Sequence, residues 1–400
     1  MKTLIDSSIY YVTAIIGLGV LSMSILSPIL PLYLTSIAIT PEIIGLMMAV
    51  SMVGMAIGEP SAGWLADRIG IKTPLYIGTF GSGLMVLCLI LSQNVAVTFV
   101  VYFLWGLVRS ALYGPCRGYL GVKAPPSRRV TIMAIMTIVI VAARSFGALP
   151  SGFLADNWGY YSVFFVSAGV ALLAGCIVLI SIEIAKLVEV QPLPGNSSDI
   201  SELPNNNHKS SLLSLSPQFI VAALQFMGLG ILMTFGPLLA TEVIGVRATE
   251  VGILFAIVGV CSMVMGIPIG MLTDRVGKKT FMILGMVTSG VAMGGIAYVT
   301  NYSSLVTFAV FNGLGFIMFT PAALALLSEK VIVSQQSTVM GIYGGLFENG
   351  GMTLGAAIGG FVWASWGPQL TFLTGSIASI IGAVICISFI SDRPRVNIHS

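Results

Sequence analysis

The stretch GWLADRIGIK, Gly63–Lys72, places an Asp, an Arg and a Lys directly after a long and largely apolar run. Nearly the same stretch, GMLTDRVGKK, returns at Gly270–Lys279. Both share one spacing: a Gly, an Asp four residues later, and a second Gly three residues after the Asp. An apolar segment that ends twice in the same charged pattern indicates a duplicated chain.

The composition predicts a surface that faces lipid. Only 8% of the 400 residues are charged and 56% are hydrophobic, whereas an ordinary soluble domain carries about 25% charged residues. Such a chain lacks the polar groups that a water-facing surface of this size needs. The net charge of +3 gives no reason to expect nucleic acid as a partner.

Several classes of site are not expected. The chain has no phosphate-binding Gly-x-x-x-x-Gly-Lys loop. Its two histidines, His208 and His399, lie in polar segments, and its five cysteines lie inside apolar runs. We therefore expect no ATPase site, no metal, no cofactor and no disulfide framework.

Twelve runs are long enough to cross a membrane, which takes roughly 20 mostly apolar residues. They lie near 9–34, 41–66, 75–92, 95–120, 130–155, 161–182, 214–241, 249–272, 280–298, 303–327, 335–360 and 369–391. A polar, Pro- and Asn-rich linker separates the sixth run from the seventh. The predicted domains are an N-terminal six-helix bundle (1–182), a linker (183–213) and a C-terminal six-helix bundle (214–400). The first run has no small-residue cleavage site after it and is expected to remain as a helix.

The basic residues predict the orientation, because Lys and Arg concentrate in cytoplasmic loops. With a cytoplasmic N-terminus, only Arg247 faces outside, while Arg109, Arg117 and Arg144 fall within spans. The others all face the cytoplasm: Lys2, Arg68, Lys72, Lys123, Arg128, Arg129, Lys186, Lys209, Arg275, Lys278, Lys279, Lys330, Arg393 and Arg395. We expect a multi-pass protein of the cell membrane with both termini in the cytoplasm.

The Gly-Asp-Gly spacing occurs in two further places. GFLADNWG, Gly152–Gly159, fits it, and GFVWASWG, Gly360–Gly367, is a decayed copy with Ala364 in place of Asp. The copies end the second, fifth, eighth and eleventh runs, so they alternate between the two membrane faces. Three-helix units in alternating orientation are the inverted repeats of secondary transporters. The expected fold is all-α, with twelve transmembrane helices in two bundles of 3+3 inverted repeats.

Each residue type of the pattern has a physical role. The first Gly lets a neighbouring helix approach closely, the Asp can pair with a helix N-terminus or an Arg, and the second Gly permits a tight turn. In this order they are Gly63, Asp67 and Gly70, and then Gly270, Asp274 and Gly277. The basic residues Arg68, Lys72, Arg275, Lys278 and Lys279 face the anionic inner leaflet. A plain helix stop with basic anchors is the alternative interpretation.

Both stretches resemble the signature cytoplasmic loop of the major facilitator superfamily, between helices 2 and 3 and between helices 8 and 9. The first copy departs from the family pattern at Ile71, where a basic residue is usual. The resemblance covers the whole chain and implies two bundles that rock around a central site, with Asp67 and Asp274 latching the cytoplasmic side. It places the family's helix 4 Arg on Arg109, although Leu-Tyr replaces the usual Gln-Gly nearby. SILSPILPLYL and GALPSG resemble drug and metabolite exporters of the family, but the full Gly-Pro-Gly-Gly pattern is missing.

Five charged residues fall inside the predicted spans, where a charge at the bilayer centre costs roughly 2.5–3.5 kcal/mol. They are Glu59, Arg109, Arg117, Arg144 and Glu348. Arg117 lies close enough to a span end to reach the interface. The other four predict a substrate and proton pathway, because a carboxyl group away from water can titrate near neutrality. An ion pair of Glu59 with Arg109 or Arg144 that only ties helices together is the alternative. Gln225 and Asn312 are further candidates for the pathway, or ordinary helix contacts.

These features favour a secondary transporter of a small organic solute. The first version exports drug-like or metabolite compounds in antiport with protons, and the second takes up an organic anion, as Arg109 and Arg144 suggest. A non-transporting receptor or assembly subunit is the alternative class, but a scaffold needs no latch. No catalytic constellation indicates an enzyme. The expected partners are a substrate, protons and the bilayer, and the chain is expected to work as a monomer.

Overall fold

The computed structural model describes residues 7–92, 94–123, 129–180, 215–330, 339–340 and 342–390. Some side chains inside these ranges are not described, among them those of Asp67, Arg117 and Asp274. The described residues form helices and turns, without a strand among them. The predicted linker and the ends of the chain lie outside the described residues.

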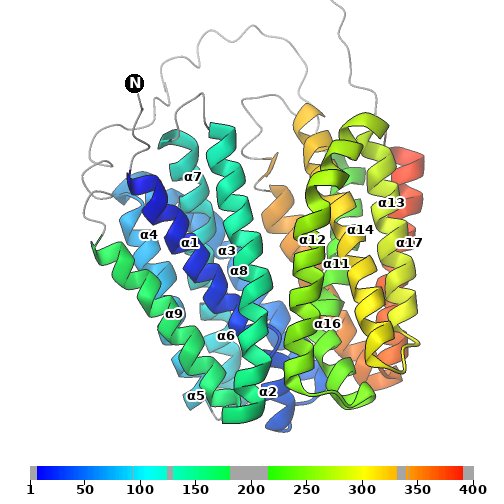
Figure 1. Ribbon diagram of the computed structural model, residues 1–400, viewed down its shortest axis with the longest axis horizontal. Coiled ribbons are helices and arrows are strands. Elements are labelled where there is room, and N and C mark those ends of the chain that lie inside the picture. The colour runs from blue at the N-terminus through cyan, green and yellow to red at the C-terminus, as the bar shows by residue number, and fades with distance from the viewer. Residues whose placement is uncertain are drawn as a thin grey trace, which may run out of the picture.

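The helices of the first half lie together on one side of the molecule (Figure 1). They are α1 (Ser7–Leu26), α2 (Leu30–Ser36), α3 (Pro41–Ile69), α4 (Lys72–Tyr76), η1 (Ile77–Gly81), α5 (Ser82–Leu91), α6 (Val95–Arg109), η2 (Ser110–Leu112), α7 (Tyr113–Lys123), α8 (Arg129–Trp158) and α9 (Tyr160–Ile180).

The helices of the second half lie on the other side. They are α11 (Ser216–Leu238), η5 (Leu239–Ile244), α12 (Ala248–Val276), α13 (Lys278–Ile296), α14 (Tyr302–Lys330), η7 (Tyr343–Glu348), α16 (Asn349–Trp366) and α17 (Pro368–Phe389). The elements η1, η5 and η7 are π-helical turns, and η2 is a 3-10 turn.

Eleven segments of the described chain are long and apolar enough to cross a membrane, and they match eleven of the predicted runs. The run predicted at 335–360 lies partly outside the described residues, and its described part continues to Trp366. Two predicted runs are interrupted. The first divides at Pro28, which has no N–H to donate, and the fourth tightens into η2, where Pro115 leaves the carbonyl of Ala111 without its helical donor.

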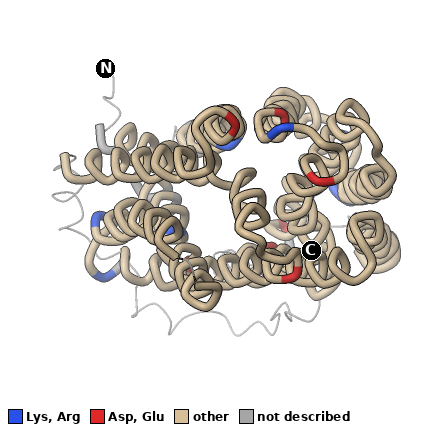
Figure 2. The backbone as a smooth tube through the Cα atoms, turned by 90° about the horizontal axis from the view of Figure 1, so that it is seen from below, with Lys and Arg blue, Asp and Glu red and all other residues tan. Residues whose placement is uncertain are grey.

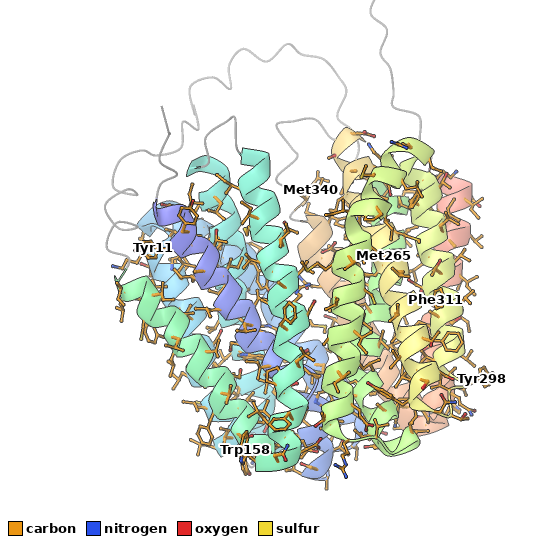
Figure 3. All side chains as sticks on the ribbon, in the orientation of Figure 1. Tyr11, Trp158, Met265, Tyr298, Phe311 and Met340 are labelled. Carbon is orange, nitrogen blue, oxygen red and sulfur yellow. The ribbon has the colours of Figure 1, made fainter. Side chains whose placement is uncertain are left out.

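The surface has the features of a membrane protein. Few residues along the tube in Figure 2 are charged. Large aromatic side chains are exposed at both ends of the helices, where amphipathic rings meet the lipid headgroups. They are Tyr10, Tyr11 and Trp64 at one end, and Trp158, Tyr161, Tyr298 and Trp366 at the other. Figure 3 shows Tyr11 near the upper end, with Trp158 and Tyr298 near the lower end.

The four copies of the repeat end four helices in the same way. The second glycine of each copy has a positive φ: 87° at Gly70, 79° at Gly159, 115° at Gly277 and 86° at Gly367. Each donates its N–H to the carbonyl four residues earlier and is followed by the next helix. The predicted tight turns are therefore confirmed, because only glycine adopts this conformation without strain. We call the ends of the molecule the Gly70 end and the Gly159 end.

Three apolar cores hold the helices, and they are distributed unevenly. One core joins both halves near the Gly159 end, with Leu26, Leu30 and Trp105 from the first half and Phe235 and Trp363 from the second. At the Gly70 end each half has a core of its own, around Ile16 and Leu120 in the first and around Phe319 and Leu327 in the second. The described helices are therefore packed as one body at the Gly159 end only.

Candidate functional site

The two halves meet mainly through two pairs of helices, α8 with α12 and α3 with α16, among the described elements. Both contacts are built on repeat glycines at the Gly159 end. A Cβ at Gly152 would collide with the backbone of Ala248 and Thr249, and a Cβ at Gly360 would collide with the carbonyl of Pro41. The glycines thus allow the backbones of opposite halves to touch.

The matching glycines at the Gly70 end have no such contact. A Cβ at Gly63 or at Gly270 would meet nothing within 4 Å. The expectation that these two glycines admit a neighbouring helix is therefore wrong for this conformation. The physical reason is that the glycine contacts of α3 with α16 and of α8 with α12 lie toward the Gly159 end. Gly152 and Gly360 therefore contact the opposite half, whereas Gly63 and Gly270, at the same position of the repeat, do not.

The basic residues of the two motif loops all lie at the Gly70 end, as predicted. The Arg68 guanidinium lies 4.4 Å from the ring centroid of Trp64, and the Lys72 ammonium lies 5.6 Å from that of Tyr76. In the second loop Lys278 pairs with Glu329, Lys279 donates to the carbonyl of Ile387 at 2.8 Å, and Arg275 is exposed. The side chains of Asp67 and Asp274 lie outside the described residues, so their latch role stays a prediction.

Asp156, in the second copy of the repeat, makes the contact that was expected of Asp67 and Asp274. Its carboxylate accepts hydrogen bonds from the first turn of α12, in the opposite half. Sequence reasoning singled out this residue as part of the repeat but gave it no role. The repeat could have predicted this role. Asp156 stands where Asp67 and Asp274 stand in their copies, so in an inverted repeat it is expected to contact a helix N-terminus at the opposite membrane face.

Arg109 ends α6 in an aromatic environment. Its guanidinium lies 4.5 Å from the ring centroid of Trp105, four residues earlier, which is a favourable cation–π geometry. Trp105 is buried and packs edge to face with Tyr102 at 6.1 Å. The Nε of Arg109 is buried without a hydrogen-bond partner among the described residues. Trp105 therefore forms a wall under the arginine and does not face lipid.

Arg144 points toward the region between the halves. On α8, Gly147 packs against α1, Ser145 packs against α12, and Phe146 and Phe153 are exposed. Helical periodicity places Arg144 between the α1 face and the α12 face, away from these exposed rings, and its side chain is exposed. The charge of Arg144 acts on that of Arg109.

Glu59 lies on the face of α3 that turns toward the second half. Gly45 on this face packs against α16, whereas Gly58 packs against the first half's own α6 and η2. Residues seven apart, which is about two helical turns, share a helix face, so Met52 and Glu59 lie on the same face as Gly45. Glu59 is half-buried and makes contacts of its own in this structure. Its two predicted roles, ion-pair partner and proton carrier, stay predictions.

Glu348 is the last residue of the π-helical turn η7, which precedes α16. Its Oε2 lies 3.8 Å from where a Cβ of Gly344 would stand, and a Cβ at Gly345 or Gly350 would meet nothing within 4 Å. Its charge acts on the buried hydroxyl of Tyr343. Single π-helical turns inside helices occur frequently at functional sites. The carboxylate is therefore half-buried in a glycine-lined stretch of the second half.

Gln225 and Asn312 are less suited to a pathway than the charged residues. Both side chains are buried. Gln225 on α11 donates a hydrogen bond of 2.8 Å to the Ser289 hydroxyl on α13, which is an ordinary contact between two helices of the same half. Asn312 lies within α14. Their place in the pathway stays a prediction.

Comparisons with known proteins agree with this architecture. The family profile of the Major Facilitator Superfamily matches residues 12–238 and 218–399. A multidrug resistance protein MdtG from Enterobacter lignolyticus is 24% identical over 91% of this chain and 87% of its own length. An MdtG protein from Escherichia coli O9:H4 is 23% identical over 94% of this chain and 93% of its own length.

Solved structures share the fold. The nucleoside transporter NupG superposes with a TM-score of 0.78 at 15% identity, covering 96% of this chain and 100% of NupG. A peptide transporter POT superposes with a TM-score of 0.81 at 14% identity, covering 95% and 93%. At this identity the likeness concerns the fold alone. The profile that covers almost the whole chain, together with the repeated loop motif and the apolar spans, shows that this protein is a transporter of the Major Facilitator Superfamily.

Proposed function

We propose that this protein exports a small drug-like or metabolite compound by alternating access, in antiport with protons. It would work as a monomer of two six-helix bundles, 1–182 and 214–400, each made of 3+3 inverted repeats. The relatives named multidrug resistance protein support the direction and the class of solute. Glu348, Glu59, Arg109 and Arg144 would form the pathway for substrate and protons.

One observation carries the alternating-access mechanism: equivalent glycines of the repeat are in different states at the two ends. Gly152 and Gly360 touch the opposite half, whereas Gly63 and Gly270 face open space. An inverted repeat can exchange these states by rocking one half against the other. The present conformation would then be open at the Gly70 end, and the other conformation would be open at the Gly159 end.

The orientation follows from the basic loops at the Gly70 end, which we place in the cytoplasm. The protein would then be an inner-membrane protein in its inward-open state, with both termini cytoplasmic. Thiol labelling of a Ser303→Cys variant, in the exposed first turn of α14 directly after the loop that follows α13, tests this assignment. A reagent that does not cross the membrane should react from outside intact cells, and reaction only from the cytoplasmic side would invert the orientation.

Uptake of an organic anion is the second candidate function, and one observation favours it. Arg109 and Arg144 both lie inside apolar spans of the first half, and the charge of Arg144 acts on Arg109; such cations attract an anionic substrate. A substrate carboxylate or phosphate would relieve their repulsion. The same transport assay separates the two functions by the direction in which a proton gradient drives the solute.

The experiment that tests the proposal is transport in proteoliposomes under an imposed pH gradient, against a panel of drugs and metabolites. We expect a proton gradient to drive at least one lipophilic or amphiphilic compound opposite to the protons. Movement of an anion in the same direction as the protons would replace the export proposal with the second candidate. Movement of no compound on the panel would favour a receptor or an assembly subunit.

The latch at the Gly70 end gives a separate prediction. Asp67→Asn and Asp274→Asn should each leave the yield of folded protein near normal and slow transport about tenfold or more, because each removes a charge that the closed Gly70 end would bind. Transport rate per folded molecule is the measurement, with the exposed Asn157→Ala as the control. Wild-type rates in both variants would reduce the motif to a helix stop.

A further inference from the structure

Asp156 joins the two halves through three hydrogen bonds. Its Oδ1 accepts the Ala248 N–H at 3.3 Å, and its Oδ2 accepts the Thr249 N–H at 2.8 Å and the Thr249 hydroxyl at 2.5 Å. The first N–H groups of a helix have no partner inside the helix and carry a partial positive charge. A carboxylate from one half thus satisfies the start of a helix in the other half.

The start of α12 divides its donors between two acids. Glu250, in the first turn of α12, accepts the N–H of Arg247 at 2.8 Å, and it belongs to the same half as α12. The next two N–H groups, of Ala248 and Thr249, go to Asp156 of the opposite half. Separation of the halves at this end would therefore expose the first turn of α12 while leaving the contact of Glu250 intact.

Glycine packing brings the carboxylate to this place. Gly152 lies one turn before Asp156 on α8, and Gly252 lies one turn after Ala248 on α12. A Cβ at either glycine would collide with the backbone of the facing helix. The two backbones are therefore in contact beside the hydrogen bonds, so a change in the angle between the halves acts directly on these bonds.

The other contact at the Gly159 end has no such acid from the repeat. Ala364 stands where the fourth copy would carry its Asp, and the contact there is made by Gly360 against the start of α3. The repeat therefore supplies an acid to the α8–α12 contact and none to the α3–α16 contact. The acid is not needed to end the helix. At the fourth copy Ala364 stands in its place, and Gly367 still adopts the φ of 86° that the turn requires.

We propose that Asp156 is a positioning residue of the transport cycle: it binds the start of α12 to hold the Gly159 end closed and releases it when that end opens. This inference rests on the alternating access of the proposed function. Asp156 would then act as a latch on the outer side of the protein. The predicted cytoplasmic latch has two acids, Asp67 and Asp274, whereas the outer latch has one. Loss of the acid should shift the resting protein toward the state that is open at the Gly159 end.

The test is the rate at which two cysteine reporters, one at a buried position and one at an exposed position, react with a thiol reagent that does not cross membranes. Native cysteines are first replaced by Ala. Ser145→Cys places a reporter in the closed contact, because Ser145 is buried against Gly259 of α12. Met263→Cys lies one turn beyond Gly259 on the same face of α12, toward the Gly70 end. The reagent is applied to right-side-out and inside-out vesicles.

Asp156→Ala should speed labelling of the Ser145→Cys reporter from the Gly159 side at least tenfold and slow labelling of the Met263→Cys reporter from the Gly70 side. Asn157→Ala is the matched control. Asn157 is the next residue on α8, and its amide donates only to its own helix, to the carbonyl of Phe153 at 2.9 Å. This control should label like the parent protein. A residue that merely stabilised the fold would lower the melting temperature without moving the two reporters in opposite directions.

Two further variants keep the test decisive if Asp156→Ala does not fold. Asp156→Asn keeps the shape and removes the charge, and Thr249→Val removes one of the three donors from the other half. Each should speed labelling of the Ser145→Cys reporter severalfold. Parent-like labelling at both reporters in these variants would overturn the latch. The readout needs no substrate, so a labelling shift without any transported compound would count against the proposed function and leave the latch standing.

Discussion

Glu348→Gln is expected to abolish transport driven by a proton gradient while substrate binding remains. A carboxyl group held away from water favours its neutral form, and a cation brought close to it favours its ionised form. An exchanger can use this opposition, because proton and substrate then stabilise different charge states of one group. Gln imitates the neutral form permanently. Glycines around Glu348 leave space for water or for a substrate, since a Cβ at Gly345 or Gly350 would meet nothing within 4 Å.

The measurement has three parts: substrate binding, exchange of labelled for unlabelled substrate, and accumulation against a gradient at several pH values. We expect the first to persist, the second to persist or weaken, and the third to disappear. Glu59→Gln is the parallel variant, since it lies on the facing side of α3. Accumulation with unchanged pH dependence in Glu348→Gln would exclude Glu348 as the coupling acid. Rescue of Glu59→Gln by neutralising Arg109 or Arg144 would identify Glu59 as an ion-pair partner.

Gly152→Val is expected to give a protein that folds but transports slowly. The valine would collide with the backbone of Ala248 and Thr249 in the opposite half, so only the state that is closed at the Gly159 end is strained. Overpacking of this kind costs about 1–3 kcal/mol, which corresponds to a shift of about 5- to 150-fold in the equilibrium between the two states. Transport per folded molecule should fall by a comparable factor.

Gly106→Val is the matched control. A Cβ at Gly106 would collide with the backbone of Ser51, which belongs to the same half. Both states contain this contact, so the strain should appear as a lower yield and a lower melting temperature. The comparison uses the yield of folded protein by size-exclusion chromatography and the transport rate per folded molecule. If Gly152→Val instead lost folded protein and kept a normal rate per molecule, the α8–α12 contact would be a fixed part of the fold.

The sequence revealed the candidate pathway residues only where a charged residue interrupts an apolar run. Charged residues inside apolar runs are visible without a structure, and Glu59, Arg109, Arg144 and Glu348 all stood out in this way. Their partners did not. The stacking of Arg109 on Trp105 depends on side-chain directions, and the position of Arg144 depends on how α8 packs against α1 and α12. Apolar runs of similar composition permit many such packings.

The sequence by itself determined the membrane setting, eleven of the spans and the four turns of the repeat. These are local properties: a run of apolar residues has to avoid water wherever it packs, and a glycine at a positive φ is required by the turn that contains it. The glycines at positions 70, 159, 277 and 367 therefore behave alike although their surroundings differ.

Only the tertiary structure decided which copies of the repeat are engaged. Gly152 and Gly270 occupy the same position in the pattern, but one touches the opposite half and the other faces open space. Likewise, Asp156 meets the N–H of Ala248 across 92 residues of chain. Such contacts depend on the angle between two bundles that share one core at the Gly159 end only. No local pattern encodes that angle, because the same sequence has to permit both ends to close in turn.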